Sequence, residues 1–108
     1  MITKSCDTYA VKLYLAGPIE VAKQVIRQEV LREGLCVTIE PTLFLYTGGE
    51  ETGYVVGLVN YPRFPSDPEA IRERARGLMH RLLEATFQHS ALMVANDVTE
   101  WISKREAA

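Results

Sequence analysis

The sequence has few cysteines, no long apolar run and no strong excess of either charge. Cys6 and Cys36 are its only cysteines, and neither belongs to a CxxC pair, so we expect two reduced thiols. No apolar stretch is long enough for a membrane span, and residues 1–10 lack the apolar core of a signal peptide. The expected location is therefore the cytoplasm, with no membrane as partner.

The net charge is also small. The chain has 12 Lys and Arg residues against 14 Asp and Glu residues, a formal charge of -2. This balance argues against a general electrostatic grip on nucleic acid. The glycine, aromatic and basic pattern of RNA-binding plaits is missing as well. We therefore do not expect a nucleic-acid partner.

Motifs of catalysis and of metal or phosphate binding are absent. There is no nucleophile elbow, HExxH or cysteine–histidine signature, and His80 and His89 lie nine residues apart. The glycine-rich residues 47–53 (TGGEETG) lack the lysine and the following helix of a phosphate loop, and Glu50 and Glu51 would repel an anion. We interpret this stretch as a plain hairpin turn, expect no metal or cofactor, and cannot name catalytic residues.

The sequence does carry clear strand and helix patterns. Residues 35–61 hold two runs rich in Val, Ile, Thr, Tyr and Phe around that turn, which predicts a β-hairpin. Apolar residues elsewhere recur with period two in strands and at helical spacing in helices. The predicted strands are residues 9–16, 37–46, 54–61 and 90–95, and the predicted helices are residues 18–33 and 66–89.

The C-terminal segment has two interpretations. Asp97 and Glu100 are spaced like a capping box, which predicts a short helix over residues 98–105. Val94, Val98 and Ile102 also fit a continued strand, which stays open as the rival.

The order of elements predicts the fold class. A single α+β domain over residues 1–108 with the order β-α-β-β-α-β fits the ferredoxin-like plait. Such a plait has an antiparallel sheet of strand order 4-1-3-2 with two helices on one face. Pro41 would then lie in an edge strand, where proline is tolerated, and the apolar strand 54–61 in the middle.

This topology predicts two candidate binding surfaces. The sheet face without helices would carry Tyr14, Phe44 and Tyr46, and a second copy of the chain is the simplest cover, giving a homodimer or larger assembly. At the opposite end, Asn60, Tyr61 and Arg63 would lie beside the start of the second helix. A helix N-terminus favours anions, so a small anionic effector is the candidate ligand there.

A basic stripe on the second helix completes the set of candidates. Arg72, Arg76 and His80 recur every four residues among acidic neighbours, which is typical of a solvated face with ion pairs. Contact with an acidic partner is the alternative.

The main functional interpretation is a non-enzymatic, self-associating accessory module that binds a protein partner or a small effector. The alternative is a small enzyme with a pocket at a dimer interface. Its polar groups would come from the residues Tyr14, Tyr46, Asn60, Arg63 and His80.

Overall fold

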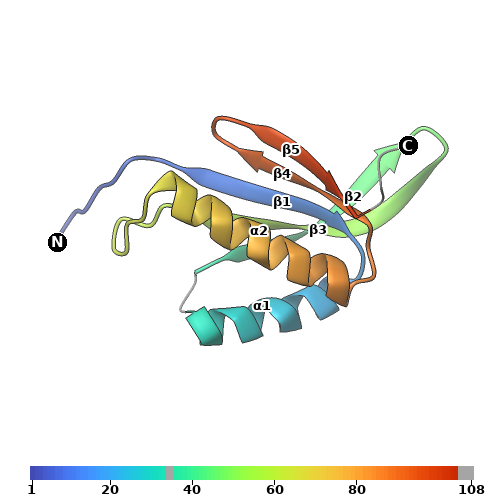
Figure 1. Ribbon diagram of the computed structural model, residues 1–108, viewed down its shortest axis with the longest axis horizontal. Helices are drawn as coiled ribbons and strands as arrows, with labels where there is room; N and C mark the ends of the chain where they lie inside the picture. Colours follow the sequence, from blue (N-terminus) through green and yellow to red (C-terminus); the bar gives the residue numbers. More distant parts are fainter. Residues whose placement is uncertain (34–35, 105–108) are drawn as a thin grey trace.

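The computed structural model describes residues 1–33 and 36–104, which form one antiparallel sheet and two helices (Figure 1). The α+β class predicted from the sequence is confirmed. In chain order the elements are β1 (Ala10–Ala16), α1 (Ile19–Glu33), β2 (Thr38–Tyr46), β3 (Gly49–Val59), α2 (Pro68–Ala85), β4 (Ser90–Ala95) and β5 (Thr99–Ser103). Neither helix of the described part is long and apolar enough to cross a membrane.

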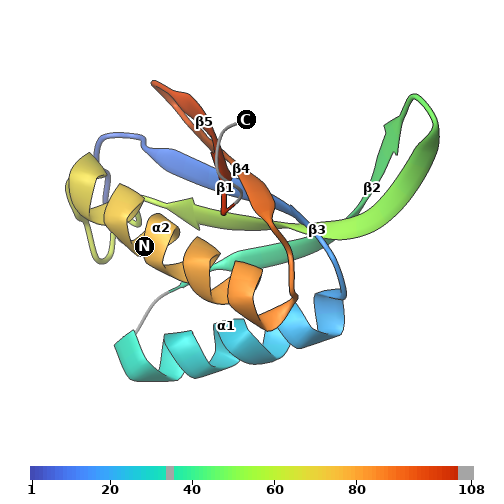
Figure 2. The ribbon, with the colours of Figure 1, turned by 45° about the vertical axis from the view of Figure 1, so that its right-hand side comes forward.

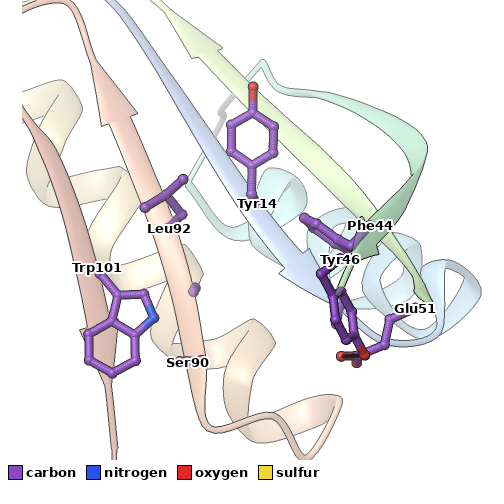
Figure 3. Close-up of a pocket in the computed structure, with 9 residues that line it drawn as sticks. Tyr14, Phe44, Tyr46, Glu51, Ser90, Leu92 and Trp101 are labelled. Atoms are coloured by element: carbon purple, nitrogen blue, oxygen red, sulfur yellow. Dashed lines mark hydrogen bonds between the residues drawn. The ribbon is translucent and has the colours of Figure 1, made fainter. Parts of the chain in front are cut away.

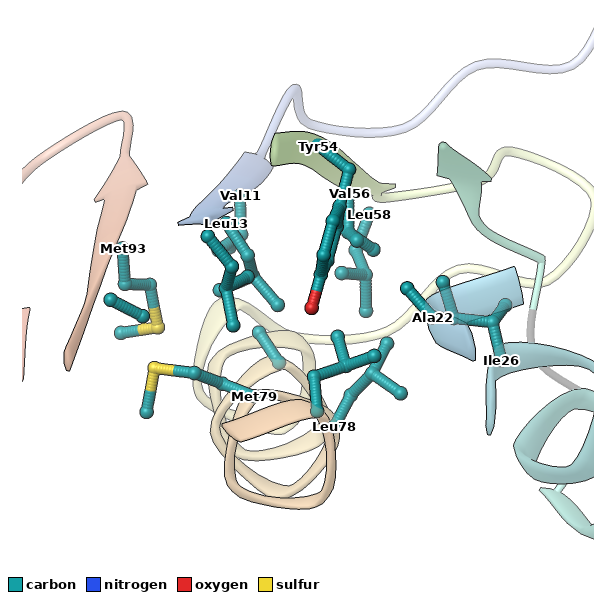
Figure 4. Packing of buried hydrophobic residues seen from close by; sticks show 14 of the residues in the cluster. Val11, Leu13, Ala22, Ile26, Tyr54, Val56, Leu58, Leu78, Met79 and Met93 are labelled. Atoms are coloured by element: carbon teal, nitrogen blue, oxygen red, sulfur yellow. The ribbon is translucent and has the colours of Figure 1, made fainter. Parts of the chain in front are cut away.

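The core lies between the sheet and the two helices, which cover the same sheet face (Figure 1). Strand side chains alternate between faces, so Val11, Leu13 and Leu15 of β1 all point toward the helices and are almost fully buried. Leu78 and Met79 of α2 pack in the same cluster (Figure 4). No helix of the described residues covers the opposite sheet face, which we call the open face.

The start of α2 follows its sequence signal. Asp67 is the N-cap, and its side chain accepts a hydrogen bond of 2.8 Å from the backbone N–H of Ala70. Pro68 is the first helical residue, where its missing N–H costs nothing. The helix ends at Ala85, before the predicted end near residue 89, because Phe87 adopts a left-handed conformation (φ 55°) that cannot continue it.

The β2–β3 hairpin is tighter than predicted. Only Thr47 and Gly48 lie between the strands, and Gly48 closes the turn at a φ of 97°. Residues 49–53, which the sequence pattern predicts as turn, belong to β3. The outer part of the hairpin therefore extends past the end of β1 as a long arm, which Figure 2 shows rising on the open side.

The predicted C-terminal helix over residues 98–105 is wrong in the part that the structure describes. This segment forms β5, which pairs with β4 and places Ile102 against the core. Thr99, Trp101 and Ile102 favour strand, and burial of Ile102 outweighs the local capping pattern. Asn96 and Asp97 make the turn, and the Ala95 N–H donates to the Val98 carbonyl (2.9 Å).

The complete strand order is β2-β3-β1-β4-β5, which differs from the predicted four-stranded order 4-1-3-2. The added edge strand β5 accounts for the difference, since β3 lies between β2 and β1 as the plait requires. The strand β2, which holds Pro41, is an edge strand as predicted. The two edges of the sheet rise on the open side, which makes that face concave (Figure 2).

Candidate functional site

One wall of the open face is a cross-strand row of three large side chains. Trp101 of β5 lies opposite Leu92 of β4, and Leu92 lies opposite Tyr14 of β1. Directly opposed residues on one sheet face contact each other across the strands, so the row forms a continuous apolar surface. Trp101 is 70% exposed because β5 is an edge strand.

The other wall comes from the β2–β3 arm. Phe44 and Tyr46 stand on the open side of β2, and the ring of Phe44 lies over Gly53 of β3 (Figure 3). A Cβ atom at position 53 would come within 2.6 Å of Phe44 Cε2 and 2.9 Å of Ala16 Cα. Glycine at this strand position therefore leaves room for the aromatic ring close to the sheet.

Between these walls is an open cavity of about 360 Å³ (Figure 3). This volume falls within the usual range of roughly 300–1,000 Å³ for small-molecule sites. Its aromatic and aliphatic walls suit a flat, partly apolar ligand. The cavity is lined by Tyr14, Ala16, Phe44, Tyr46, Glu51, Ser90, Ala91, Leu92 and Trp101.

Glu51 is the one acidic side chain in this lining, and it is tied to the aromatic wall. The Tyr46 hydroxyl donates a hydrogen bond of 3.1 Å to Glu51 Oε1. This bond, with slight burial and the nearby negative charge, raises the pKa of Tyr46 above its ordinary value. The cavity thus combines π faces with one carboxylate, an arrangement that attracts a cation carried on a flat ligand.

The structure brings three of the predicted site residues together and adds two that the sequence analysis missed. Tyr14, Phe44 and Tyr46 line the same cavity. Trp101 escapes the sequence prediction because that prediction places a helix over residues 98–105. Glu51 escapes it because the same prediction places a turn over residues 47–53. The available signal was period-two alternation through residues 51–55 and 98–102, which puts both side chains on the open face.

Asn60, Tyr61 and Arg63 lie at the other end of the sheet and do not join this cavity. The Asn60 side chain donates to the backbone carbonyl of Asp7 (2.8 Å) and accepts from the backbone N–H of Ser66 (2.9 Å). Its amide thus fastens two chain segments, and Asn60 and Tyr61 line a second cavity of about 260 Å³.

The other two residues of that group, Tyr61 and Arg63, contact the side chain of Phe64. The rings of Tyr61 and Phe64 stack with centroids 6.3 Å apart. The Arg63 guanidinium lies 5.4 Å from the centre of the Phe64 ring. Tyr61 and Arg63 therefore both contact Phe64, and an anion at this end of the sheet stays a prediction.

The basic stripe on α2 pairs mainly with the β4–β5 hairpin. Arg72 contacts Asp97 (2.9 Å), and Arg76 contacts Glu100 (3.0 Å). His80 is exposed on the same helix, away from the open face. Among residues 1–33 and 36–104, no group of three or more His, Cys, Asp or Glu side chains is placed to hold a metal ion.

Comparison with known proteins gives matches in structure only. No protein-family model matches the sequence, and no curated protein sequence matches it. A phage SAM lyase in the apo state shares the fold with a TM-score of 0.67 at 16% identity, over 93% of this chain and 91% of that one. A phage SAM lyase in complex with S-methyl-5'-thioadenosine gives a TM-score of 0.70 at 12% identity, over 100% and 98% of the two chains.

These matches overturn the main functional interpretation of the sequence. A non-enzymatic binding module was inferred because no catalytic motif is present, yet the same fold over almost the whole length is that of an enzyme. The cavity residues are dispersed over five strands, so no local sequence motif marks them.

Proposed function

We propose that this protein is a small enzyme that binds S-adenosylmethionine on the open sheet face and cleaves it as a SAM lyase does. The observation that carries the proposal is the aromatic cavity with Glu51 at its edge, on a fold shared with phage SAM lyase. Two free thiols, Cys6 and Cys36, support a reducing compartment, so we keep the cytoplasm as the place of action.

The cavity chemistry suits both halves of this substrate. Adenine is flat, and stacking of a base on an aromatic ring is worth roughly 1–3 kcal/mol. Trp101 and Tyr14 on one wall and Phe44 on the other offer such rings. The sulfonium is a cation, which π faces and a carboxylate attract. We assign the sulfonium to the Tyr46–Glu51 side and the base to the Trp101 side.

The proposed reaction breaks the bond between the sulfonium and the amino-acid side chain. The bonding electron pair leaves with sulfur, which becomes the neutral thioether S-methyl-5'-thioadenosine. The four-carbon fragment balances this loss either by releasing a proton from the neighbouring carbon, to give an alkene, or by closing its own carboxylate onto the vacated carbon, to give a lactone. In the second case opposite charges cancel, and surroundings less polar than water favour such a step.

Glu51 has a defined role in each version of this chemistry. In the elimination its carboxylate is the group available to accept the released proton. In the ring closure it acts by binding and orienting the cation. The identity of the four-carbon product therefore separates the two roles.

Incubation of the purified protein with S-adenosylmethionine, followed by mass spectrometry, tests the activity. We expect S-methyl-5'-thioadenosine and one four-carbon product in equal amounts. The variant Trp101→Ala should reduce product formation, whereas Phe64→Ala, an exposed aromatic outside the cavity, should not. Unchanged substrate, with no binding of S-methyl-5'-thioadenosine detected by calorimetry, would refute the proposal.

We also propose that copies of the chain associate through the open face. The cavity is open to solvent, and Tyr46 and Trp101 in its lining are 53% and 70% exposed. Covering these side chains would remove apolar surface from water and enclose a ligand. Light scattering behind a sizing column should give a dimer or larger, and a monomer at high micromolar concentration would exclude this association.

A further inference from the structure

Trp101, the outermost wall of the cavity, sits on an edge strand with little to hold it from the open side. Among the described residues, its strand β5 pairs with β4 alone and has no strand beyond it. The indole is 70% exposed and lies opposite Leu92. The ladder with β4 and the contacts on the helix side of the sheet therefore fix the position of this wall.

A row of ion pairs joins α2 to the β4–β5 hairpin on that side. Arg72 Nη2 lies 2.9 Å from Asp97 Oδ2 at the hairpin turn, and Arg76 Nη2 lies 3.0 Å from Glu100 Oε1 within β5. Glu84 Oε1 accepts from Lys104 Nζ at 3.3 Å, beyond the end of the strand. The α2 members lie at four-residue multiples, so they share one helix face, and their partners follow the hairpin from its turn to its end.

The middle pair is the one nearest to the indole. Glu100 and Trp101 are consecutive in β5, so their side chains point to opposite faces of the sheet. If the Glu100 carboxylate moves and the β5 backbone moves with it, the indole of Trp101 moves as well. The Glu100 and Arg76 side chains are 32% and 30% exposed. The Glu100 carboxylate is thus more buried than that of Asp97, which is 56% exposed.

From this arrangement we infer that Arg76 and Glu100 are positioning residues that set the Trp101 wall of the ligand cavity. The inference rests on the proposed function, because it names the groups that shape the same site. Neither residue lines the cavity, and both act through the strand that carries Trp101. The predicted basic stripe thereby gains a role at the site although it lies on the other side of the sheet.

Arg76 provides its own matched control. Besides Glu100 it contacts Glu73 at 2.8 Å, one turn away on the same helix. Glu73→Gln and Glu100→Gln therefore each remove one carboxylate from the same guanidinium. Only Glu100→Gln releases the link between α2 and β5.

Two measurements test the inference, and one of them needs no ligand. Trp101 is the only tryptophan, so its emission and its quenching by acrylamide report on this wall alone. We expect Glu100→Gln to change both and to weaken binding of S-methyl-5'-thioadenosine, measured by calorimetry, by about five-fold, the equivalent of one exposed ion pair. Glu73→Gln should leave emission, quenching and affinity as in the original protein.

Exchange of the two charges adds a rescue. In the Glu73→Gln background, which removes the neighbouring carboxylate, the exchange Arg76→Glu with Glu100→Arg should restore the emission and the affinity that either single change loses. A folded Glu100→Gln protein with unchanged emission and affinity, or equal changes in both glutamine variants, would overturn the inference. If the original protein does not bind S-methyl-5'-thioadenosine, the proposed function fails, while the tryptophan measurements still decide whether the pair positions Trp101.

Discussion

The Tyr46 hydroxyl and the Glu51 carboxylate are joined by a hydrogen bond of 3.1 Å across the β2–β3 hairpin. Their strands meet at the two-residue turn of Thr47 and Gly48, so the bond fixes the outer end of the arm. It also holds a carboxylate beside an aromatic ring at the mouth of the cavity (Figure 3). The charge of Glu51 and the ring of Tyr46 can be separated by mutation.

The first prediction is that Glu51→Gln discriminates between a cationic and a neutral ligand. Loss of one exposed charge contact should raise the KM for S-adenosylmethionine about five-fold. The affinity for S-methyl-5'-thioadenosine, which has no sulfonium, should change little in calorimetry. The control Tyr46→Phe keeps the ring and the carboxylate and should preserve the difference between the two ligands. Equal weakening of both by Glu51→Gln would contradict a role for its charge.

The second prediction concerns acid stability through Asp97. Burial works against the ionised form of Asp97, but hydrogen bonds from its own backbone N–H, from Tyr9 and from Arg72, with the charge of Arg72, outweigh it. The pKa of Asp97 therefore lies below its ordinary value. A lowered folded-state pKa contributes stability above the unfolded pKa, and this contribution is lost as the pH falls through the folded value.

Denaturant unfolding at several pH values measures this effect. Between about pH 5 and about pH 3 the original protein should lose more unfolding free energy than Asp97→Asn, which has no charge to lose. Asp7→Asn is the control, since its carboxylate makes no hydrogen bond to a described side chain, and it should follow the original protein. Identical pH profiles for Asp97→Asn and the original protein would contradict the role of this contact.

Local signals in the sequence predict much of this fold because neighbouring residues determine them. Alternation in residues 9–16 and the capping of α2 by Asp67 depend on chain geometry and on nearby N–H groups. Pro41 also predicts an edge strand correctly, since its missing N–H donor is tolerated at the edge of a sheet.

The C-terminal segment shows where such signals stop. Asp97 and Glu100 are spaced like a capping box, but both carboxylates are bound by arginines of α2, more than twenty residues away in the sequence. Ile102 adds burial in the core. These tertiary contacts determine that the segment is a strand, and a local pattern cannot contain them. The capping pattern therefore predicts a helix, and the wall formed by Trp101 is not predicted.

The third prediction is that Gly77→Ala stabilises the protein. Gly77 lies within α2, and an added Cβ would meet no atom within 4 Å. Alanine in a helix interior is favoured over glycine by roughly 0.5–1 kcal/mol, so the free energy of unfolding should rise by that amount. Gly53→Ala should instead destabilise the fold, because its Cβ would meet the Leu15 carbonyl oxygen and the Phe44 ring. Denaturant unfolding of both variants measures these changes. Destabilisation by Gly77→Ala would contradict the open space at that position.

The last prediction concerns the end of α2. The N–H of Gln88 bonds to the Leu83 carbonyl (3.0 Å) and the N–H of Phe87 to the Glu84 carbonyl (3.3 Å), which is the Schellman pattern. Phe87 holds the left-handed position at a φ of 55° although its side chain is 89% exposed. Glycine avoids the cost of about 1 kcal/mol that an L side chain has there, so Phe87→Gly should raise the free energy of unfolding by about that amount.

Phe87→Ala separates the backbone from the ring, because alanine removes the ring but keeps the Cβ in the left-handed conformation. Its unfolding free energy should stay near that of the original protein, well below that of Phe87→Gly. If both variants destabilise the fold equally, the ring itself must contribute packing in solution, for example against a second copy of the chain. Unfolding at two protein concentrations distinguishes that case, since stabilisation by association grows with concentration.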